Sequence, residues 1–327
     1  MSVTFIRGLE NYRPQSDRPT VATIGTFDGI HRGHQAILMR VGEVSQATGH
    51  DAVLVTFDPH PRVVLSPEQI PLLLTSIEEK EKFIPDFFSG TMLVLEFNEK
   101  LKDPSAEEFV KNIMVRTIGA KEMIVGYDHA LGRNRGGNID ELRRLGELYG
   151  FGVEVVGPVM NQKMPISSSR IRRAMLENDY EEAMSLLGHD YAIYGTVEKG
   201  IGLGRRIGYP TANVRYSLRK LLPPEGVYVC WAQVAGETKC GMMFIGKNYF
   251  NPQKRVSVEA HLFDFDKEIY NEEIIVYPTQ FVRANKKFDS TAALVEQIKK
   301  DEKNILEIIE KEKQSVCKER EKTKDHC

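Results

Sequence analysis

The sequence contains no long hydrophobic run. Its longest apolar stretch, around Val227 to Ala235, is interrupted by Gln233 and has the length of a barrel strand. A membrane-spanning helix needs at least about 18 apolar residues in succession. The first residues form neither a basic segment nor a long apolar one, so we see no secretory signal. We therefore expect a cytoplasmic protein with no membrane partner.

Cysteine is scarce as well. The four cysteines, Cys230, Cys240, Cys317 and Cys327, show no C-x-x-C spacing, which argues against a structural zinc site. A disulfide between Cys230 and Cys240 across a hairpin is one alternative, but buried free thiols fit a cytoplasmic protein better.

An excess of charge of either sign is also missing. Lys and Arg number 44 against 46 Asp and Glu, which leaves a formal net charge of -2. A protein that binds nucleic acid regardless of its sequence needs a basic excess to displace counterions, so we expect no nucleic-acid partner. With 41% hydrophobic and 28% charged residues, the 327-residue chain has the composition of a folded protein of about two domains.

The first half of the chain alternates short apolar runs with helical patterns. Ser76-x-x-Glu79 and Ser105-x-x-Glu108 have the spacing of capping boxes at helix starts. Strands that alternate with helices predict a parallel sheet covered by helices on both faces. The expected strands are residues 21–24, 53–57, 92–95, 123–125 and 153–156.

The pattern changes after about residue 188, where short strands separated by Gly-rich turns predict an antiparallel barrel or sandwich. A final helix is expected to begin near Ser290, and the charged residues after Lys311 are read as its fraying end or as disorder. The strands expected here are residues 194–197, 226–234, 240–245, 256–263 and 274–277. We divide the chain into domains 1–186 and 187–312 and a charged tail, 313–327.

The first chemical constellation follows the strand at residues 21–24. Gly25 to His34 combines glycines with His31 and His34, whose rings share one face of the first helical turn. A helix N-terminus with unpaired N–H groups suits a phosphate, and imidazoles there can donate hydrogen bonds to a transferring phosphoryl group. Two surface histidines are the alternative for H-x-x-H alone, and zinc binding lacks an obvious third ligand.

Two further segments are expected at the same edge of the sheet, residues 57–61 after one strand and the Gly- and Arg-rich residues 126–138 after another. A third is the run of serines at 167–169, followed by Arg170 and Arg172. Basic residues at a helix start oppose the helix dipole unless an anion binds there.

The second constellation is the Gly-rich segment 195–213. Four glycines between 200 and 208 predict a loop that wraps a nucleotide. Thr211 and Asn213 lie two apart in extended chain, so both point the same way and offer the hard ligands that suit Mg²⁺. In the alternating strand 256–262, Glu259 is the best-placed general base, although a solvated strand face is the simpler reading.

The Gly25–His34 segment, the run at 56–61 and the Ser-Ser-Ser-Arg-Ile-Arg segment together resemble the adenylyltransferase module of bacterial bifunctional riboflavin kinase/FAD synthetase. The resemblance implies a Rossmann-like nucleotidyltransferase domain that joins AMP from ATP to FMN, giving FAD and pyrophosphate. It implies that the catalytic residues are His31, His34 and Arg170. The implied ATP contacts are Gly25, Phe27, Asp28, Gly33, Asp128 and Ser168. The implied flavin contacts are Phe57, Asp58, His60 and Asn138.

Residues from about Tyr191 to Asp301 resemble the riboflavin kinase module of the same family, a small antiparallel β-barrel with a terminal helix. The resemblance implies that Glu259 takes the proton of the riboflavin 5′-hydroxyl as it attacks the γ-phosphorus, while Thr211 and Asn213 hold Mg-ATP. The implied ATP loop residues are Gly200, Gly204, Arg205, Gly208 and Pro210, and the implied flavin contacts are Arg283 and Phe288. The expected partners are riboflavin, FMN, FAD, ATP, ADP and pyrophosphate, bound by a monomer or weak homo-oligomer.

Several alternatives stay open. His129, Leu131 and Asn138 stand where the family usually has two phenylalanines and an aspartate, so a chain with only kinase activity is one of them. A flavin-binding regulator without catalysis is another. A different small-molecule adenylyltransferase would explain the first half of the chain and leave the second half unexplained.

Overall fold

A computed structural model describes residues 2–130, 137–247 and 256–324, with side chains as far as residue 311. The chain forms two compact units. One consists of Met1–Arg173 with Ser185–His189, and the other of Ala174–Met184 with Asp190–Cys327. The units interleave along the chain close to the domain boundary expected between residues 186 and 187. Leu131 lies outside the described residues.

The first unit is built on a six-stranded parallel sheet in the order β1-β4-β3-β2-β5-β6. Its strands are β1 Val3–Arg7, β2 Thr20–Ile24, β3 Asp51–Asp58, β4 Gly90–Glu96, β5 Ala120–Gly126 and β6 Gly152–Val156. All five expected strands are confirmed. The four central ones, β2 to β5, read as apolar runs because a central parallel strand is buried on both faces. The edge strand β1 has exposed positions and lacks that signal.

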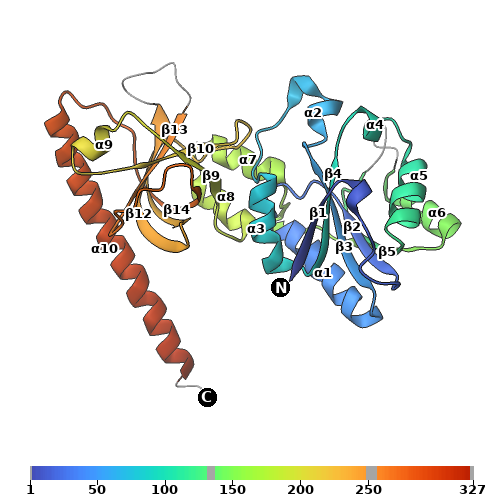
Figure 1. The fold of residues 1–327 in the computed structure, drawn as a ribbon. Coiled ribbons are helices and arrows are strands. Elements are labelled where there is room, and N and C mark those ends of the chain that lie inside the picture. The colour runs from blue at the N-terminus through green and yellow to red at the C-terminus, as the bar shows by residue number, and fades with distance from the viewer. Residues whose placement is uncertain (1, 131–136, 248–255, 325–327) are drawn as a thin grey trace. The chain divides into compact units, whose positions relative to one another are not determined.

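Helices cover both faces of this sheet, with α5 and α6 on one side and α1 on the other (Figure 1). Both capping boxes form, with Ser76 before α3 and Ser105 before α5. The helical elements of the first region are η1 Leu9–Asn11, α1 Arg32–Thr48, α2 Arg62–Leu65, η2 Pro67–Gln69, α3 Ile77–Phe87, α4 Glu99–Lys102, α5 Ala106–Phe109, the π-helix η3 Val110–Thr117 and α6 Ile139–Tyr149. A hairpin of β7 Met160–Asn161 and β8 Met164–Pro165 precedes α7 Ser168–Leu176 and α8 Tyr180–Leu187.

The second unit is a closed antiparallel barrel, in the order β10-β13-β12-β11-β14-β9. Its strands are β9 Ile193–Glu198, β10 Ala212–Tyr216, β11 Gly226–Val234, β12 Glu237–Lys247, β13 Val256–Leu262 and β14 Glu273–Ala284, with the short helix α9 Leu203–Arg206 between β9 and β10. Closure leaves no unpaired sheet edge. The barrel alternative is therefore the right one, and β10 is the strand that the sequence pattern did not reveal.

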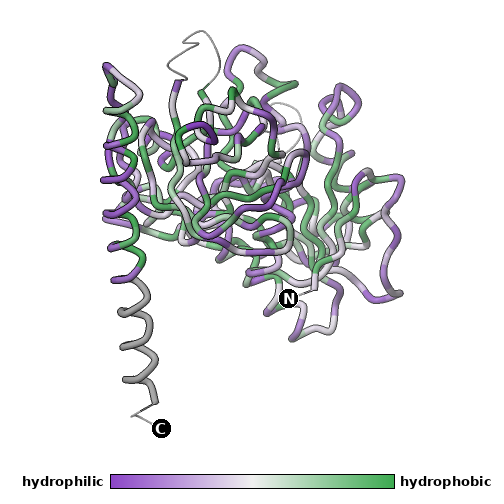
Figure 2. The backbone as a smooth tube through the Cα atoms, turned by 60° about the vertical axis from the view of Figure 1, so that its left-hand side comes forward, coloured by the Kyte–Doolittle hydropathy of each residue, from purple (hydrophilic) through white to green (hydrophobic). Residues whose placement is uncertain are grey.

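The last helix, α10, runs from Thr291 to Lys324, so helix and not disorder extends into the charged tail. Along its described side chains it is mainly hydrophilic with short hydrophobic stretches (Figure 2). Ile305 and Ile309, two of the expected inner residues, are buried against the barrel.

The hairpin cysteines do not form a disulfide. Cys230 pairs in register with Gly241, and Cys240 with Trp231. Because neighbouring residues of a strand point to opposite faces, the two thiols lie on opposite sides of the sheet, and both are free.

Candidate active sites

The three predicted loops of the first unit follow strands that are neighbours in the sheet. Gly25 to His31 follows β2, Pro59 to Pro61 follows β3, which ends at Asp58, and Tyr127 to Ala130 follows β5. The order of the strands reverses between β2 and β5, and a parallel sheet offers its ligand crevice outside the carboxyl ends of its strands at such a point. The topology therefore brings these segments to one edge of the sheet.

His31 and His34 lie face to face at the start of α1. His31 is the N-cap residue, and its Nδ1 accepts the backbone N–H of His34 at 3.4 Å. The two rings are stacked with centroids 3.7 Å apart. Burial lowers the pKa of His31 to about 4 and lowers the pKa of His34 well below its usual value. Both imidazoles are therefore neutral at pH 7, and His31 keeps one N–H donor, on Nε2.

Asp28 is a buried carboxylate with partners on two other segments. Its Oδ1 accepts the backbone N–H of Thr75 at 2.9 Å, and its Oδ2 accepts from the Arg172 guanidinium. The side chain is 1% exposed. A carboxylate buried to this extent stays charged only when it is paired and hydrogen-bonded. Asp28 thereby holds the loop, the start of α3 and the arginine of α7 together.

The two arginines of α7, Arg170 and Arg172, have different hydrogen-bond partners, because residues two apart on a helix do not share a face. Arg170 is buried and donates hydrogen bonds to the Asn161 and Met164 carbonyls and to the Asn161 amide oxygen, all in the β7–β8 hairpin. Arg172 reaches the Gly25–His31 loop through Asp28 and also donates to the Leu72 carbonyl at 2.8 Å. The spacing could show that only one arginine faces the site, but not which one.

Of the other predicted contacts of the first unit, Ser168 and Phe27 touch this centre directly. The Ser168 hydroxyl donates to the Asp28 carbonyl at 2.8 Å, and the Phe27 ring contacts that of His34. Asn138 is the N-cap of α6 and accepts the N–H of Glu141. The remaining predicted residues are Gly25 and Gly33 in the loop and helix start, half-buried Phe57 and His60, and exposed Asp58 and Asp128.

Lys80 is a residue that the sequence reasoning missed. It lies on α3, is buried, and donates from Nζ to the Thr26 carbonyl at 2.7 Å. Burial lowers its pKa, and the charges of Asp28 and Asp58 oppose that shift. A lysine in a capped amphipathic helix looks like a surface residue in sequence, so no local signal could have shown its contact with the loop.

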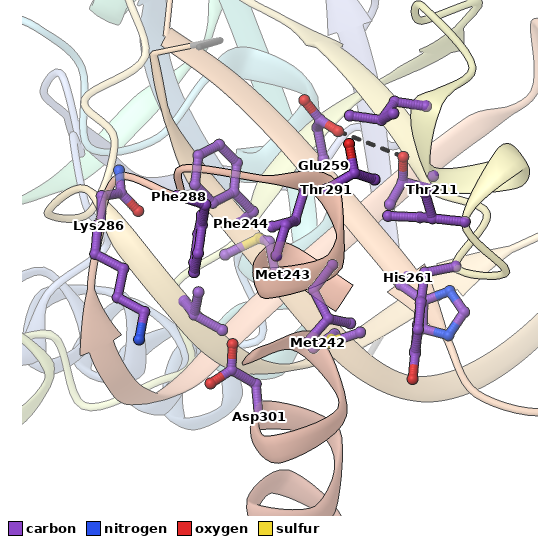
Figure 3. A pocket seen from close by; sticks show the side chains of 18 of the residues that line it. Thr211, Met242, Met243, Phe244, Glu259, His261, Lys286, Phe288, Thr291 and Asp301 are labelled. Carbon is purple, nitrogen blue, oxygen red and sulfur yellow. Dashed lines mark hydrogen bonds between the residues drawn. The ribbon is translucent and has the colours of Figure 1, made fainter. Parts of the chain in front are cut away.

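The second unit contains a cavity of about 720 Å³. Figure 3 shows Thr211 and Glu259 toward one end of it and Phe288 and Lys286 toward the other. Six of the predicted residues line the cavity: Gly204, Thr211, Asn213, Glu259, Arg283 and Phe288. The walls also contain Tyr209, Met242, Phe244 and Asn285. Strand alternation shows which face Met242 and Phe244 of β12 occupy but not that they line a cavity, and Tyr209 and Asn285 lie outside the strands.

Glu259 lies at the centre of a small network of oxygen atoms. The hydroxyls of Thr211 and Ser257 donate to its carboxylate at 3.4 and 3.1 Å, and Asn213 stands opposite it in register. Burial raises the pKa of Glu259, while these two hydrogen bonds lower it in part. A carboxylate with a raised pKa is a stronger base toward a hydroxyl proton. The Thr211 hydroxyl and the Asn213 amide offer hard oxygen ligands of the kind that fit Mg²⁺.

The Gly-rich segment curls tightly beside this network. A Cβ on Gly200 would lie 2.5 Å from the Asn213 amide nitrogen, and one on Gly204 would lie 2.2 Å from the Tyr209 carbonyl oxygen. The Pro210 carbonyl lies 2.7 Å from Nδ1 of His261. Arg205 and Gly208 are exposed. Gly204 is therefore needed for close packing against the backbone, and Gly200 leaves room for the Asn213 side chain where it lies, whatever the loop binds.

Arg283 joins β14 to α10. Its guanidinium donates to both carboxylate oxygens of Asp301, at 2.6 to 3.0 Å, and Asp301 is buried. Gln297 donates to the same carboxylate. This ion pair fixes the cavity wall that carries Phe288 and the first turns of α10.

Comparison with known proteins gives matches over both units. Residues 13–170 match a family described as FAD synthetase, and residues 187–309 match one described as riboflavin kinase. A bifunctional riboflavin kinase/FMN adenylyltransferase of Buchnera aphidicola (Schizaphis graminum) is 37% identical over 94% of this chain and 98% of its own. Proteins of the same description from Listeria monocytogenes and Escherichia coli K12 are 36% and 32% identical, over 88% and 91% of this chain and 92% and 95% of their own.

A solved structure from Streptococcus pneumoniae is also similar, with a TM-score of 0.79 and 30% identity over 93% of this chain and 98% of its own. It is described as a macrolide-efflux protein. In the described part of the present chain, no helix is both long and apolar enough to cross a membrane.

The depressed pKa of His31 predicts a loss of stability in acid. Its pKa is 6.5 in an ordinary environment and about 4 in the folded protein, so between these values the unfolded chain binds a proton that the folded chain does not. The contribution of this group to the free energy of unfolding is therefore fully present above about pH 6.5. It is lost as the pH falls toward 4, and amounts to about 3 kcal/mol. His31→Asn keeps an N-cap acceptor and removes this contribution.

Urea unfolding of the wild type and His31→Asn from pH 7.5 to 4.5 measures the effect. We expect a shallower pH dependence in the variant, and equal slopes would contradict the assignment.

Proposed function

The chain belongs to the family of bifunctional riboflavin kinase/FMN adenylyltransferases, and on this premise we propose that it phosphorylates riboflavin to FMN and then adenylylates FMN to FAD, using ATP in each step. The observation that carries the proposal is that each unit gathers its own group of polar side chains. The first has the stacked His31 and His34 beside the Asp28–Arg172 pair, and the second has Glu259 with Thr211 in the barrel cavity. We assign adenylyl transfer to residues 1–186 and the kinase to residues 187–312, followed by the tail 313–327. Since both reactions consume ATP, we place the protein in the cytoplasm. We propose that it acts there as a monomer or weak homo-oligomer.

In adenylyl transfer, a phosphate oxygen of FMN attacks the α-phosphorus of ATP, and the bond to the bridging oxygen breaks to release pyrophosphate. The chain contributes positioning and charge stabilisation, with no covalent intermediate. We assign contact with the phosphates to Nε2–H of His31, to the imidazole of His34 and to the first N–H groups of α1. A neutral imidazole donates one hydrogen bond without requiring a proton from solution.

Arg172 replaces Arg170 in our assignment of the arginine that stabilises the triphosphate. Its guanidinium is held by Asp28 at residues 25–31, here named the nucleotide loop, whereas that of Arg170 is hydrogen-bonded to the β7–β8 hairpin. Asp28 then acts by orienting Arg172 and the loop, since its own carboxylate is buried. The flavin-side contacts of Phe57, Asp58, His60 and Asn138, and those of Asp128 and Ser168 with ATP, stay predictions.

In the kinase reaction, the 5′-hydroxyl of riboflavin loses its proton to Glu259 as its oxygen attacks the γ-phosphorus of ATP, and ADP leaves. Hydrogen bonds from Thr211 and Ser257 orient the carboxylate toward the cavity. Thr211 and Asn213 would hold Mg²⁺ together with the ATP phosphates, whose charge the ion neutralises. Phe288 and the wall fixed by Arg283 would cover the flavin.

Incubation of the chain with riboflavin, ATP and Mg²⁺, followed by separation of the flavins, tests the whole proposal. We expect FMN and FAD from the wild type. Glu259→Gln should slow FMN formation by roughly 10²–10⁴-fold, because it removes the proton acceptor, and should still convert supplied FMN to FAD. Folded wild-type protein that makes neither product would refute the proposal, and FMN without FAD would leave only the kinase.

The two arginines are distinguished by paired substitutions. Arg172→Lys keeps a charge beside Asp28 but loses the planar fork, so FAD formation from FMN should fall by about 10²–10³-fold. Arg170→Lys should cost much less. Rates of FAD formation under saturating FMN, with the kinase rate of each variant as the control, decide between them, and the reverse order of losses would return the role to Arg170.

A further inference from the structure

The nucleotide loop of the first unit contains an unusual run of backbone conformations. Phe27, Gly29 and Ile30 all have positive φ, at 46°, 90° and 43°. This region is costly for any residue with a Cβ, and most of all for a β-branched one such as Ile30, which is fully buried. Such a conformation persists only where surrounding contacts determine it.

Those contacts come in part from residues 185–189, here named the strap, which belong to the first unit. Nε2 of His189 lies 2.9 Å from the Gly29 carbonyl oxygen. Because a carbonyl only accepts, Nε2 must carry the hydrogen. The amide nitrogen of Gln35 donates both to the Ile30 carbonyl and to the Leu187 carbonyl of the strap, each at 2.9 Å.

The strap is packed as closely as it is hydrogen-bonded. The His189 ring lies 4.7 Å from the ring of Phe83 on α3, which fixes its direction. A Cβ on Gly29 would meet Leu74 at 2.8 Å and Leu187 at 3.4 Å. Gly188, with φ of 74°, leaves no room for a side chain beside Arg32 and Gln35. The conformation of the loop and that of the strap therefore depend on each other.

We propose that His189 is a positioning residue for adenylyl transfer. It does not contact the reacting atoms. Its hydrogen bond keeps the Gly29 carbonyl oxygen directed away from the triphosphate. The loop then presents its N–H groups and His31, and not its carbonyl oxygens, to the triphosphate. This inference rests on the proposed adenylyltransferase function. It makes the strap part of the adenylyltransferase site, although the strap lies next to the first barrel strand in the sequence.

Without His189, the Gly29 carbonyl loses its partner and the strained loop populates other conformations. ATP then binds only the fraction of molecules whose loop is in the competent conformation, which raises the apparent dissociation constant by the reciprocal of that fraction. Saturating ATP restores the bound state. The signature of a positioning role is therefore a higher KM for ATP at nearly unchanged kcat.

The full-length chain tests this with three variants. His189→Ala should raise the KM for ATP in FAD formation from FMN by about 5- to 30-fold, with kcat within about threefold of the wild type. This is the lower part of the range expected when a buried hydrogen-bond partner is removed, because the bond is partly buried. His189→Gln carries an amide N–H of similar reach and should return KM to near the wild-type value. His50→Ala, between the end of α1 and β3, is the matched control and should behave as the wild type.

Riboflavin kinase kinetics and the thermal unfolding midpoint are measured on the same preparations, and both should be little changed in His189→Ala. An unchanged KM in that variant overturns the inference. So does a parallel loss of kcat and folded protein that His189→Gln does not rescue, since that would be packing alone. If the wild type itself makes no FAD from FMN, it is the proposed function that fails.

Discussion

A buried carboxylate imposes the constraint on which the first site depends. Asp28 is almost fully removed from water, so its charge must be matched by the Thr75 N–H and the Arg172 guanidinium. These partners lie on the segment before α3 and on α7, far from Asp28 in sequence. One ionic requirement therefore gathers three segments around the N-terminus of α1 and fixes the arginine that faces the nucleotide loop.

The two units meet the same chemical problem, a highly charged triphosphate, with different means. In our proposal, the first relies on neutral imidazoles, helix N–H groups and a strained loop, because the FMN phosphate that attacks the α-phosphorus requires no base. The second places a carboxylate of raised pKa beside a hydroxyl and an amide, because a riboflavin hydroxyl must lose its proton. The difference in residue types thus follows from the difference in nucleophile.

Much of this arrangement follows from local sequence, and the remainder depends on contacts between distant segments. Apolar runs identify the buried strands β2 to β6, and the capping boxes identify α3 and α5, because each signal lies within a few residues. The edge strand β1 and the short strand β10 lack a distinctive pattern. His31, His34 and Glu259 could be singled out by spacing. Lys80, His189 and the contact of Arg172 with Asp28 could not, because their partners lie 54 to 160 positions away in the sequence.

The central claim is that one chain cleaves ATP at two places, at the γ-phosphate in the barrel and at the α-phosphate beside α1. ATP labelled at a single phosphorus tests it directly, with riboflavin as the only flavin supplied. Label from the γ position should appear in FMN and persist in FAD, whereas label from the α position should appear in FAD and never in FMN. Label from the α position in FMN, or no label from the γ position in either flavin, would contradict the account.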